Sequence, residues 1–478
     1  MNTPPARRPL ALALAAACWL AAGTALAQPS EPAPDGRAGA PAWPTAAASP
    51  PAPDPECASA PESIDWASAQ RRLARCNRDL RVALRATESA LADVRVAGQR
   101  PNPTLSAGIG NVNPQLGLGG ANNPLDYPLD YIARLDQTFE RGGKRGLRIE
   151  SAEQAWSASR WNAADTLRRQ QLALAQAWIA LWGAQERVRL QQDVLELFRR
   201  ALDAAQRRLK AGDIAAADVS RIELDMRRAE AERTVADGEL VAARNAIASL
   251  LAIDPPGAGP RATEPWPATD AAGAPLLAPG EAERPDLQAA RAQQAAADAQ
   301  SRLARSQRTR DVTIGVQAEL YAPPAGGGWL LGAFVSVPLF VNHRYEGEIA
   351  RAEADREVAS ENRARIELQA RAEQRRLLDA RAAARARRER IERDALPLAE
   401  KVAANAELAW RKGAGTVLEL LDALRQLRAL QIEALQARLD DDRADAAARA
   451  EMLTAAAAAD PVFGESLRLR PTIPDAPK

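Results

Sequence analysis

Residues able to support catalysis or metal binding are few in this chain of 478 residues. It contains one histidine, His343, and three cysteines, Cys18, Cys57 and Cys76. No CxxC or Cys/His spacing typical of a zinc site is present. A lone histidine is more often a surface or interface residue than a ligand. We therefore predict no catalytic residue, no resident metal and no cofactor.

The charged residues instead form local patterns. Arg141, Lys144 and Arg145 surround the pair Gly142-Gly143, and such a cluster is usually solvated or touches lipid headgroups. The net charge is +1, and Arg and Glu alternate along the helical stretches as on solvated helix surfaces. This pattern lacks the basic face expected of a nucleic-acid-binding protein.

Carboxylates follow two similar glycine turns, Lys-Ala-Gly212-Asp213 and Lys-Gly413-Ala. Glu419 and Asp422 lie three residues apart, so they share one helix face. Asp218 occupies the position equivalent to Glu419 after the first turn, where Arg221 replaces the second acid. The spacing alone fits either a cation-attracting site or the solvated flank of a coiled coil.

Two long helices position these turns. From Leu167 to Leu209 an apolar residue recurs at every seventh position, which predicts a supercoiled helix that packs along one seam. A helix from Gly146 to Ala211 would be on the order of 100 Å long. A second long run opens at Phe340 and closes before Gly413.

The chain is an internal duplication. Residues 139 and 340 are 201 apart, as are 212 and 413, whereas the segments before them match at an offset of 207. We assign residues 62–255 to the first repeat and 284–460 to the second, with a linker at 256–283. The helix preceding the first hairpin is expected from about Ile64 to Gly98.

The flanking segments differ in composition. Residues 1–27 resemble a secretory signal peptide, with a lipoprotein signal at Cys18 as the second choice. Residues 28–61 read as a disordered Pro/Ala-rich leader and 461–478 as a disordered tail. In an oxidising compartment Cys57 and Cys76 either pair or remain two free thiols.

Each repeat also contains a predicted β-hairpin, at 105–138 and 312–338. Val312, Ile314 and Val316 alternate with polar residues, the signature of an outer-membrane barrel strand. Four strands cannot close a barrel, which needs at least about eight, and an open edge cannot remain in lipid. We therefore predict a homotrimer with twelve strands.

The duplicated plan resembles the TolC-type outer-membrane efflux channel family. The match covers Ile64 to about Ala459 and includes Arg100-Pro-Asn-Pro-Thr-Leu, Ser336-Val-Pro-Leu-Phe340 and the two glycine turns. The resemblance implies a mainly helical fold with membrane β-strands: a trimeric twelve-stranded barrel in the outer membrane of a Gram-negative cell above a periplasmic α-barrel. The stretch Phe139 to Arg145 is similar to that of the subgroup serving heavy-metal cation pumps.

The resemblance also assigns roles to residues and partners. It implies a passive duct for substrates delivered by an inner-membrane resistance–nodulation–division pump and a periplasmic adaptor. The adaptor would contact the tips at Lys210, Gly212, Asp213, Lys412, Gly413 and Gly415. Glu419, Asp422 and Asp218 would form a periplasmic gate.

Three alternatives remain at this point. A protein-secretion duct of type I would share the architecture. A periplasmic coiled-coil adaptor would need a lipoyl-like domain and a β-barrel domain, for which this chain lacks strands. An enzyme is the least favoured alternative.

Overall fold

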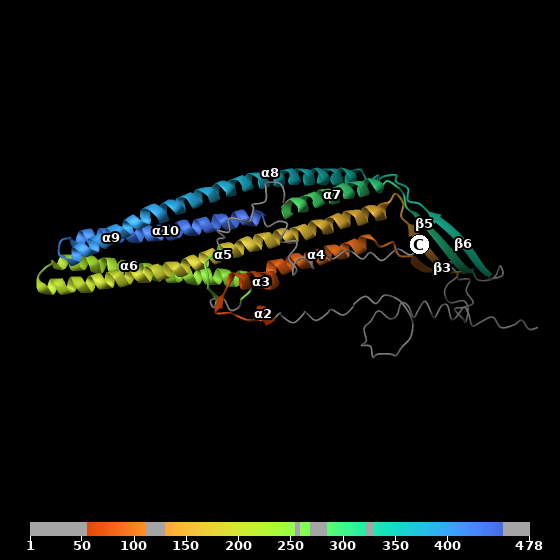
Figure 1. Ribbon diagram of the computed structural model, residues 1–478. Coiled ribbons are helices and arrows are strands. Elements are labelled where there is room, and N and C mark those ends of the chain that lie inside the picture. Colours follow the sequence, from red (N-terminus) through yellow and green to blue (C-terminus); the bar gives the residue numbers. More distant parts are fainter. Residues whose placement is uncertain (1–54, 111–129, 254–258, 268–283, 322–327, 453–478) are drawn as a thin grey trace, which may run out of the picture. The chain divides into compact units, whose positions relative to one another are not determined.

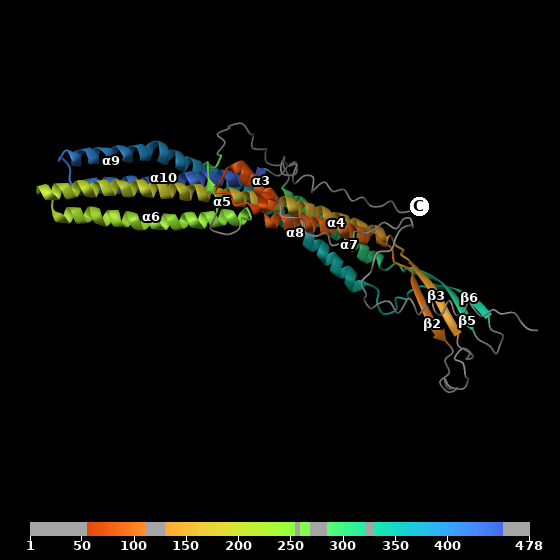
Figure 2. The same cartoon turned by 90° about the horizontal axis from the view of Figure 1, so that it is seen from below.

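The described chain divides into two compact units in a computed structural model (Figures 1 and 2). Residues 55–110, 130–253, 259–267, 284–321 and 328–452 are described. The strand unit contains described residues from 100–144 and 306–344, and the helical unit contains the others. The expectations for the signal peptide, Cys18, residues 28–54 and the tail lie outside the described residues.

The strand unit is a four-stranded antiparallel sheet. Its strands are β2 (Thr104–Gly110), β3 (Asp130–Phe139), β5 (Val312–Tyr321) and β6 (Gly328–Ser336), in the order β2-β3-β5-β6. The β3–β5 pairing joins the hairpins of the two repeats, with Phe139 opposite Val312. Strands β2 and β6 are therefore the free edges of the sheet.

The sheet presents one apolar face that nothing in the described chain covers. Because neighbours across a ladder point to the same side, Leu105, Leu135, Val316 and Leu331 share this face. All four are exposed, and Leu331 is 79% exposed. A water-soluble domain would bury such a face.

The opposite face is polar and rich in glycine. Arg134 pairs with Asp136 at 2.8 Å and its guanidinium lies 4.6 Å from the ring centre of Phe334. A side chain at Gly315 would collide with the Asp136 carboxylate. Gly315 thus leaves room for this cluster on the polar face.

The junction after β3 is held by buried charge. Lys144 is 5% exposed, and its ammonium donates to both oxygens of Asp311 at 2.9 Å. The backbone N–H of Arg141 donates to the same carboxylate at 3.0 Å. Gly142 and Gly143 have φ of 75° and 70°, a region that favours glycine.

These two glycines give a matched test of packing against backbone strain. A Cβ on Gly142 would lie 2.8 Å from the Cβ of Thr309, whereas one on Gly143 would meet nothing within 4 Å. We expect Gly143→Ala to cost about 1 kcal/mol of unfolding free energy through its positive φ alone. Gly142→Ala should cost roughly 2–4 kcal/mol because a steric clash adds to the strain. Denaturant unfolding in detergent measures both, and equal costs would contradict this description of the junction.

The helical unit consists of two hairpins of long helices with shorter helices beside them (Figure 1). Helix α5 (Lys144–Ala211), of 68 residues, turns into α6 (Ala216–Leu250). In the second repeat α8 (Glu346–Arg390), a π-helical turn (Ile391–Ala395) and α9 (Leu396–Arg411) lead into α10 (Val417–Met452). The shorter helices are α2 (Pro55–Ala58), α3 (Trp66–Cys76), α4 (Arg78–Ala97) and α7 (Pro285–Ser306).

The seven-residue repeat lies on the buried side of α5 along most of its length. Leu167, Leu174, Leu181 and Leu195 are at most 2% exposed. Leu209, one turn before the tip, is 36% exposed. The seam therefore holds the hairpin together and opens towards its end.

The second long helix departs from the prediction in two ways. It begins at Glu346 rather than Phe340, because residues 337–345 form an irregular connection. It also contains the π-helical turn, in which the N–H of Leu396 bonds to the carbonyl of Ile391, five residues back. Pro397 has no N–H and crowds the preceding turn, which accounts for the break.

The predicted single helix up to Gly98 is also wrong, since it is divided into α3 and α4. Asn77 ends the first and caps the second, with its side chain accepting from the N–H of Leu80 at 3.0 Å. Its amide donates to the carbonyl of Leu250 at the end of α6. Asn77 thus supplies hydrogen bonds to the first turn of α4 and to the last turn of α6.

The linker contains more structure than predicted. Residues Ser63–Ile64 (β1) pair in parallel with Arg261–Ala262 (β4), inside the predicted linker. Trp66 packs edge-on against Trp178 and Trp266, at 5.5 and 4.6 Å. Aromatic burial explains why these polar-looking segments are ordered.

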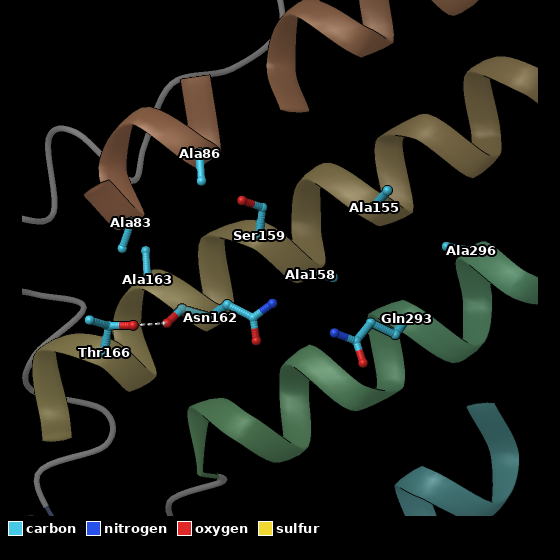
Figure 3. Close-up of a pocket in the computed structure, with 10 residues that line it drawn as sticks. All are labelled: Ala83, Ala86, Ala155, Ala158, Ser159, Asn162, Ala163, Thr166, Gln293 and Ala296. Atoms are coloured by element: carbon cyan, nitrogen blue, oxygen red, sulfur yellow. Dashed lines mark hydrogen bonds between the residues drawn. The ribbon is translucent and has the colours of Figure 1, made fainter. Parts of the chain in front are cut away.

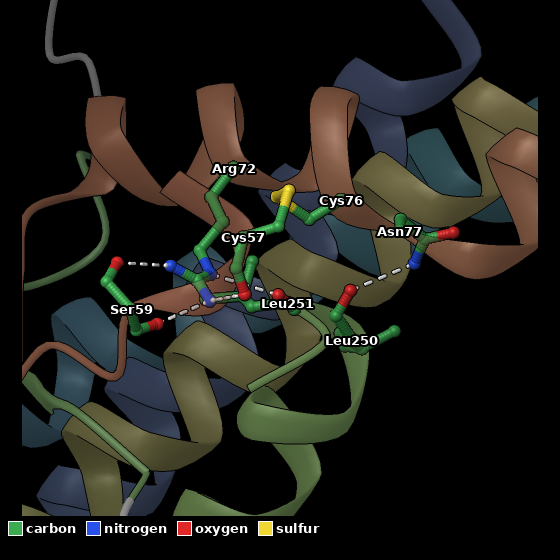
Figure 4. Close-up of a disulfide and its surroundings, with 7 residues drawn as sticks. All are labelled: Cys57, Ser59, Arg72, Cys76, Asn77, Leu250 and Leu251. Carbon is green, nitrogen blue, oxygen red and sulfur yellow. Dashed lines mark hydrogen bonds between the residues drawn. A yellow bond between two sulfur atoms is a disulfide. The ribbon is translucent and has the colours of Figure 1, made fainter. Parts of the chain in front are cut away.

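A disulfide closes this region (Figure 4). Cys57 and Cys76 are bonded, which ties α2 to the end of α3. The buried guanidinium of Arg72 donates to the carbonyls of Cys57, Ser59 and Leu251. The predicted disordered leader therefore does not extend to residue 61.

Candidate functional site

The two hairpin tips have the same local structure. Gly212 and Gly413 adopt φ of 81° and 77°. The N–H of Asp213 bonds to the carbonyl of Arg208 at 2.9 Å, and the N–H of Ala414 bonds to that of Ala409 at 2.9 Å. These are the hydrogen bonds of a glycine-terminated helix, in which glycine supplies the left-handed residue.

The tip residues predicted from the sequence are accessible. Lys210, Gly212, Asp213, Lys412 and Gly413 are exposed, and Gly415 is half-buried. A Cβ at Gly212 or Gly413 would meet nothing within 4 Å. Within the described chain, their packing therefore leaves them free to meet a partner.

An apolar cluster, the tip cluster, holds the two tips together. It includes Phe198 of α5, Ile222 of α6, Trp410 of α9 and Leu421 of α10, all at most 4% exposed. Arg208 donates to the carbonyl of Trp410 at 3.1 Å and lies 5.5 Å from its ring. The end of α5 is thereby attached to the end of α9.

The predicted gate carboxylates are on the surface near the tips. Glu419 and Asp422 are exposed on α10, and Asp218 is half-buried on α6. Glu419 accepts from the N–H of Thr416 at 2.9 Å while the Thr416 hydroxyl accepts from the N–H of Glu419 at 3.2 Å. This reciprocal pair is a capping box, so Glu419 also has a structural role.

The other two carboxylates have partners on their own helices. Asp422 accepts from the side-chain amide of Gln426 at 2.8 Å, and Asp218 pairs with Arg221 at 3.0 Å. In the described chain, the contacts of all three acids stay within four residues. A single chain therefore does not bring them together into one site.

Ion pairs that were not predicted from the sequence connect the two hairpins. Asp225, 4% exposed on α6, accepts from Arg425 of α10 at 2.6 Å, and Arg428 of α10 pairs with Glu232 of α6. A signal was present, because Asp225 lies in the apolar series Ile222, Met226 and Ala229. An acid in such a series needs a partner when buried.

A second ionic layer joins α8 to α10. Arg381 pairs with Asp445 at 2.7 Å, and Arg388 pairs with Asp441 at 3.1 Å. Between these pairs lies Asp442, which is 5% exposed and has neither an ion pair nor a hydrogen bond in the described chain. Burial raises the pKa of its carboxyl to about 6, against the opposing effect of Arg438 and Arg388.

No arrangement for catalysis or metal binding is found in the described residues. They contain no group of three potential metal ligands, and His343 is exposed. A groove of about 400 Å³ between α4, α5 and α7 is lined mostly by alanines, with Asn162 and Gln293 as its largest polar residues (Figure 3). It offers no ionisable side chain.

None of the described helices combines the length and apolarity needed to span a bilayer.

Comparison with known proteins gives one family. A model described as "Outer membrane efflux protein" matches residues 70–252 and 280–452. The cobalt-zinc-cadmium resistance protein CzcC of Cupriavidus metallidurans is 28% identical over 302 residues, which cover 62% of this chain and 70% of that protein.

Solved structures share the fold at low identity. A membrane protein from Pseudomonas aeruginosa has a TM-score of 0.68 at 20% identity, covering 84% of this chain and 90% of that one. CusC, described by its transmembrane channel formation, has a TM-score of 0.68 at 17% identity, covering 82% and 93%.

Proposed function

We propose that this chain, which belongs to the outer membrane efflux protein family, is the trimeric exit duct of a tripartite pump that exports heavy-metal cations. Family membership confirms the efflux function and the outer-membrane localisation predicted from the sequence. It also confirms the predicted fold class, with a large helical part and one four-stranded antiparallel sheet per chain. The family is one of channels, which agrees with a duct rather than an enzyme.

The observation that carries the proposal is the incomplete sheet. The uncovered apolar face of the four strands is unfavourable in water. Their two free edges would leave backbone N–H and C=O groups unpaired in lipid. Three copies joined edge to edge through β2 and β6 would give twelve strands and no free edge. The apolar face would then meet lipid, and the face with Arg134 and Glu319 would line the pore.

The proposed partners are a periplasmic adaptor and an inner-membrane pump. The support is the exposed pair of tips, which the tip cluster and Arg208 hold in a fixed relation. Lys210, Asp213 and Lys412 give this surface charges of both signs. An adaptor would therefore meet a preformed surface, which lowers the entropic cost of binding.

The identity of the cargo is the most specific part of the proposal. It is supported by the relative named for cobalt, zinc and cadmium resistance. The stretch Phe139 to Arg145 adds less support than its motif suggested, because Gly142 and Lys144 serve the junction with Asp311. Cargo identity therefore depends on measurement of metal export.

We further propose that Glu419 and Asp422 form the periplasmic gate, with Asp218 beside it. Three copies would place six of these carboxylates around one axis, where they repel one another and attract cations. Asp218 contributes less net charge because Arg221 pairs with it. Divalent cations on the periplasmic side should therefore block the pore.

The gate is tested by single-channel conductance in planar bilayers. The double variant Glu419→Gln/Asp422→Asn removes the charge while glutamine keeps the capping box. We expect the half-blocking concentration of divalent cation to rise about tenfold, equivalent to about 1.4 kcal/mol of lost binding.

The control for the gate test is Glu433→Gln. Glu433 is exposed on the same helix and pairs with Arg387 at 3.3 Å. It should leave the block unchanged, because it lies three turns further from the tip. An unaltered blocking constant in the double variant would mean that Glu419 and Asp422 serve only helix capping and solvation.

A further inference from the structure

One end of the sheet carries arginines to which the proposed duct function assigns no role. Thr104, Phe139, Val312 and Ser336 mark this end, where the strands meet the connections to helices. The basic cluster predicted around Gly142-Gly143 is only partly available there. Lys144 is buried against Asp311, and Arg145 donates to the carbonyl of Gly98 at 2.6 Å.

Arg141 remains exposed, and other arginines of the strand unit join it. Their side chains make no ion pair and no hydrogen bond in the described chain. The guanidinium of Arg310 contacts an aromatic ring. We call this set the rim arginines: Arg100, Arg141, Arg308, Arg310 and Arg344.

Several contacts place the rim arginines in one neighbourhood. A side chain at Gly142 would touch Thr309, so the segment with Arg141 lies against the segment with Arg308 and Arg310. The guanidinium of Arg310 lies 5.5 Å from the ring centre of Phe340. The connection after β6, which contains Arg344, is therefore part of the same surface.

Exposed apolar residues adjoin these charges. Phe139 ends the apolar face of β3 and is 52% exposed, while Leu339 and Val341 are 74% and 71% exposed. An apolar band that ends in aromatic and basic residues is typical of the boundary between hydrocarbon and headgroups. The other end of the sheet carries the acids Asp130 and Glu319 instead.

We propose that the rim arginines bind the phosphodiester headgroups of anionic phospholipids in the periplasmic leaflet of the outer membrane. Guanidinium groups bind phosphate oxygens in a bidentate manner. The continuity of the rim with the lipid-facing side of the sheet selects lipid over a soluble anion. The inference rests on the outer-membrane location of the family, and it is independent of pump and cargo.

Native mass spectrometry of the full-length mature protein tests this. The protein is equilibrated in neutral detergent with equal amounts of phosphatidylglycerol and phosphatidylcholine, and retained lipids are counted. The wild type should retain phosphatidylglycerol preferentially. Arg141→Gln/Arg310→Gln should lower that preference at least about fivefold, while Arg141→Lys/Arg310→Lys should keep most of it.

The matched control is Arg356→Gln/Arg390→Gln, which removes two exposed arginines of α8. It should retain phosphatidylglycerol as the wild type does. Equal retention of the two lipids by the wild type, or unchanged retention by the rim variant, would overturn the proposal. So would displacement of the lipid by millimolar inorganic phosphate, which would indicate a general anion site.

The same spectra separate this proposal from trimer formation. A wild type that is monomeric would refute the proposed assembly rather than the lipid site. A rim variant that falls apart into monomers, while its remaining trimers keep the normal lipid count, would assign the arginines to the contact between copies and overturn the proposal.

Discussion

Cells that carry Gly212→Pro or Gly413→Pro are expected to lose cation export although the protein still reaches the outer membrane. Both glycines adopt positive φ, which proline cannot adopt, and both donate a hydrogen bond through the N–H that proline lacks. The turn would have to move, and the surface proposed to meet the adaptor would change. The measurement is growth in cobalt, zinc or cadmium, with the amount of trimer determined in the same cells.

Two milder changes are the controls for the tip prediction. Gly212→Ala and Gly413→Ala keep the N–H and have open space for the Cβ, so they should cost about 1 kcal/mol and preserve most export. Gly238→Ala, within α6 and equally open, should leave export unchanged, because alanine is a better helix former than glycine and the site is far from the turn. Full resistance in both proline variants would exclude the tips as the docking surface.

Acidification is expected to stabilise the helical unit through Asp442. Its pKa is about 6 in the folded protein against 3.8 as the ordinary value, so folding favours the protonated form. The contribution of Asp442 to stability should therefore be most favourable below about pH 4, fall as the pH rises through 6, and stay constant above that. The full effect is about 3 kcal/mol.

Asp442→Asn should abolish this part of the pH dependence and raise stability at pH 7. Asp445→Asn is the contrasting variant, because Asp445 is also buried but pairs with Arg381 and Arg449. Its loss should destabilise the protein, since two arginines lose their partner. Thermal unfolding of the two variants from pH 4 to 8 measures both effects. A stability difference between wild type and Asp442→Asn that does not change between pH 4 and 6 would contradict the assignment.

The sequence predicted those features that repeat along the chain. The seven-residue pattern of α5, the alternation in β5 and the offset between the glycine turns each depend on periodicity, which backbone geometry imposes locally. The glycines at the tips were identifiable because positive φ restricts the residue type.

What the sequence did not predict depends on contacts between distant segments. Asn77 interrupts a helical pattern because the carbonyl of Leu250 lies beside it. Residues 259–267 are ordered because β4 pairs with β1 and Trp266 packs against Trp66. The pairing of Lys144 with Asp311 likewise joins the two repeats, so neither local pattern reveals it.

The proposed gate residues lie between these two cases. The spacing of Glu419 and Asp422 placed them correctly on one exposed helix face. It gave no indication of the pairing of Asp225 with Arg425, because that contact crosses between hairpins. Local pattern can thus locate a candidate residue, whereas its electrostatic partners come from the tertiary structure.

The central claim is that three copies of this chain close one pore. The most direct measurement is the mass of the purified mature protein in detergent, followed by reconstitution of the same sample into planar bilayers. We expect a mass of three chains and discrete conductance steps. A stable monomer, or a trimer without conductance, would contradict the claim.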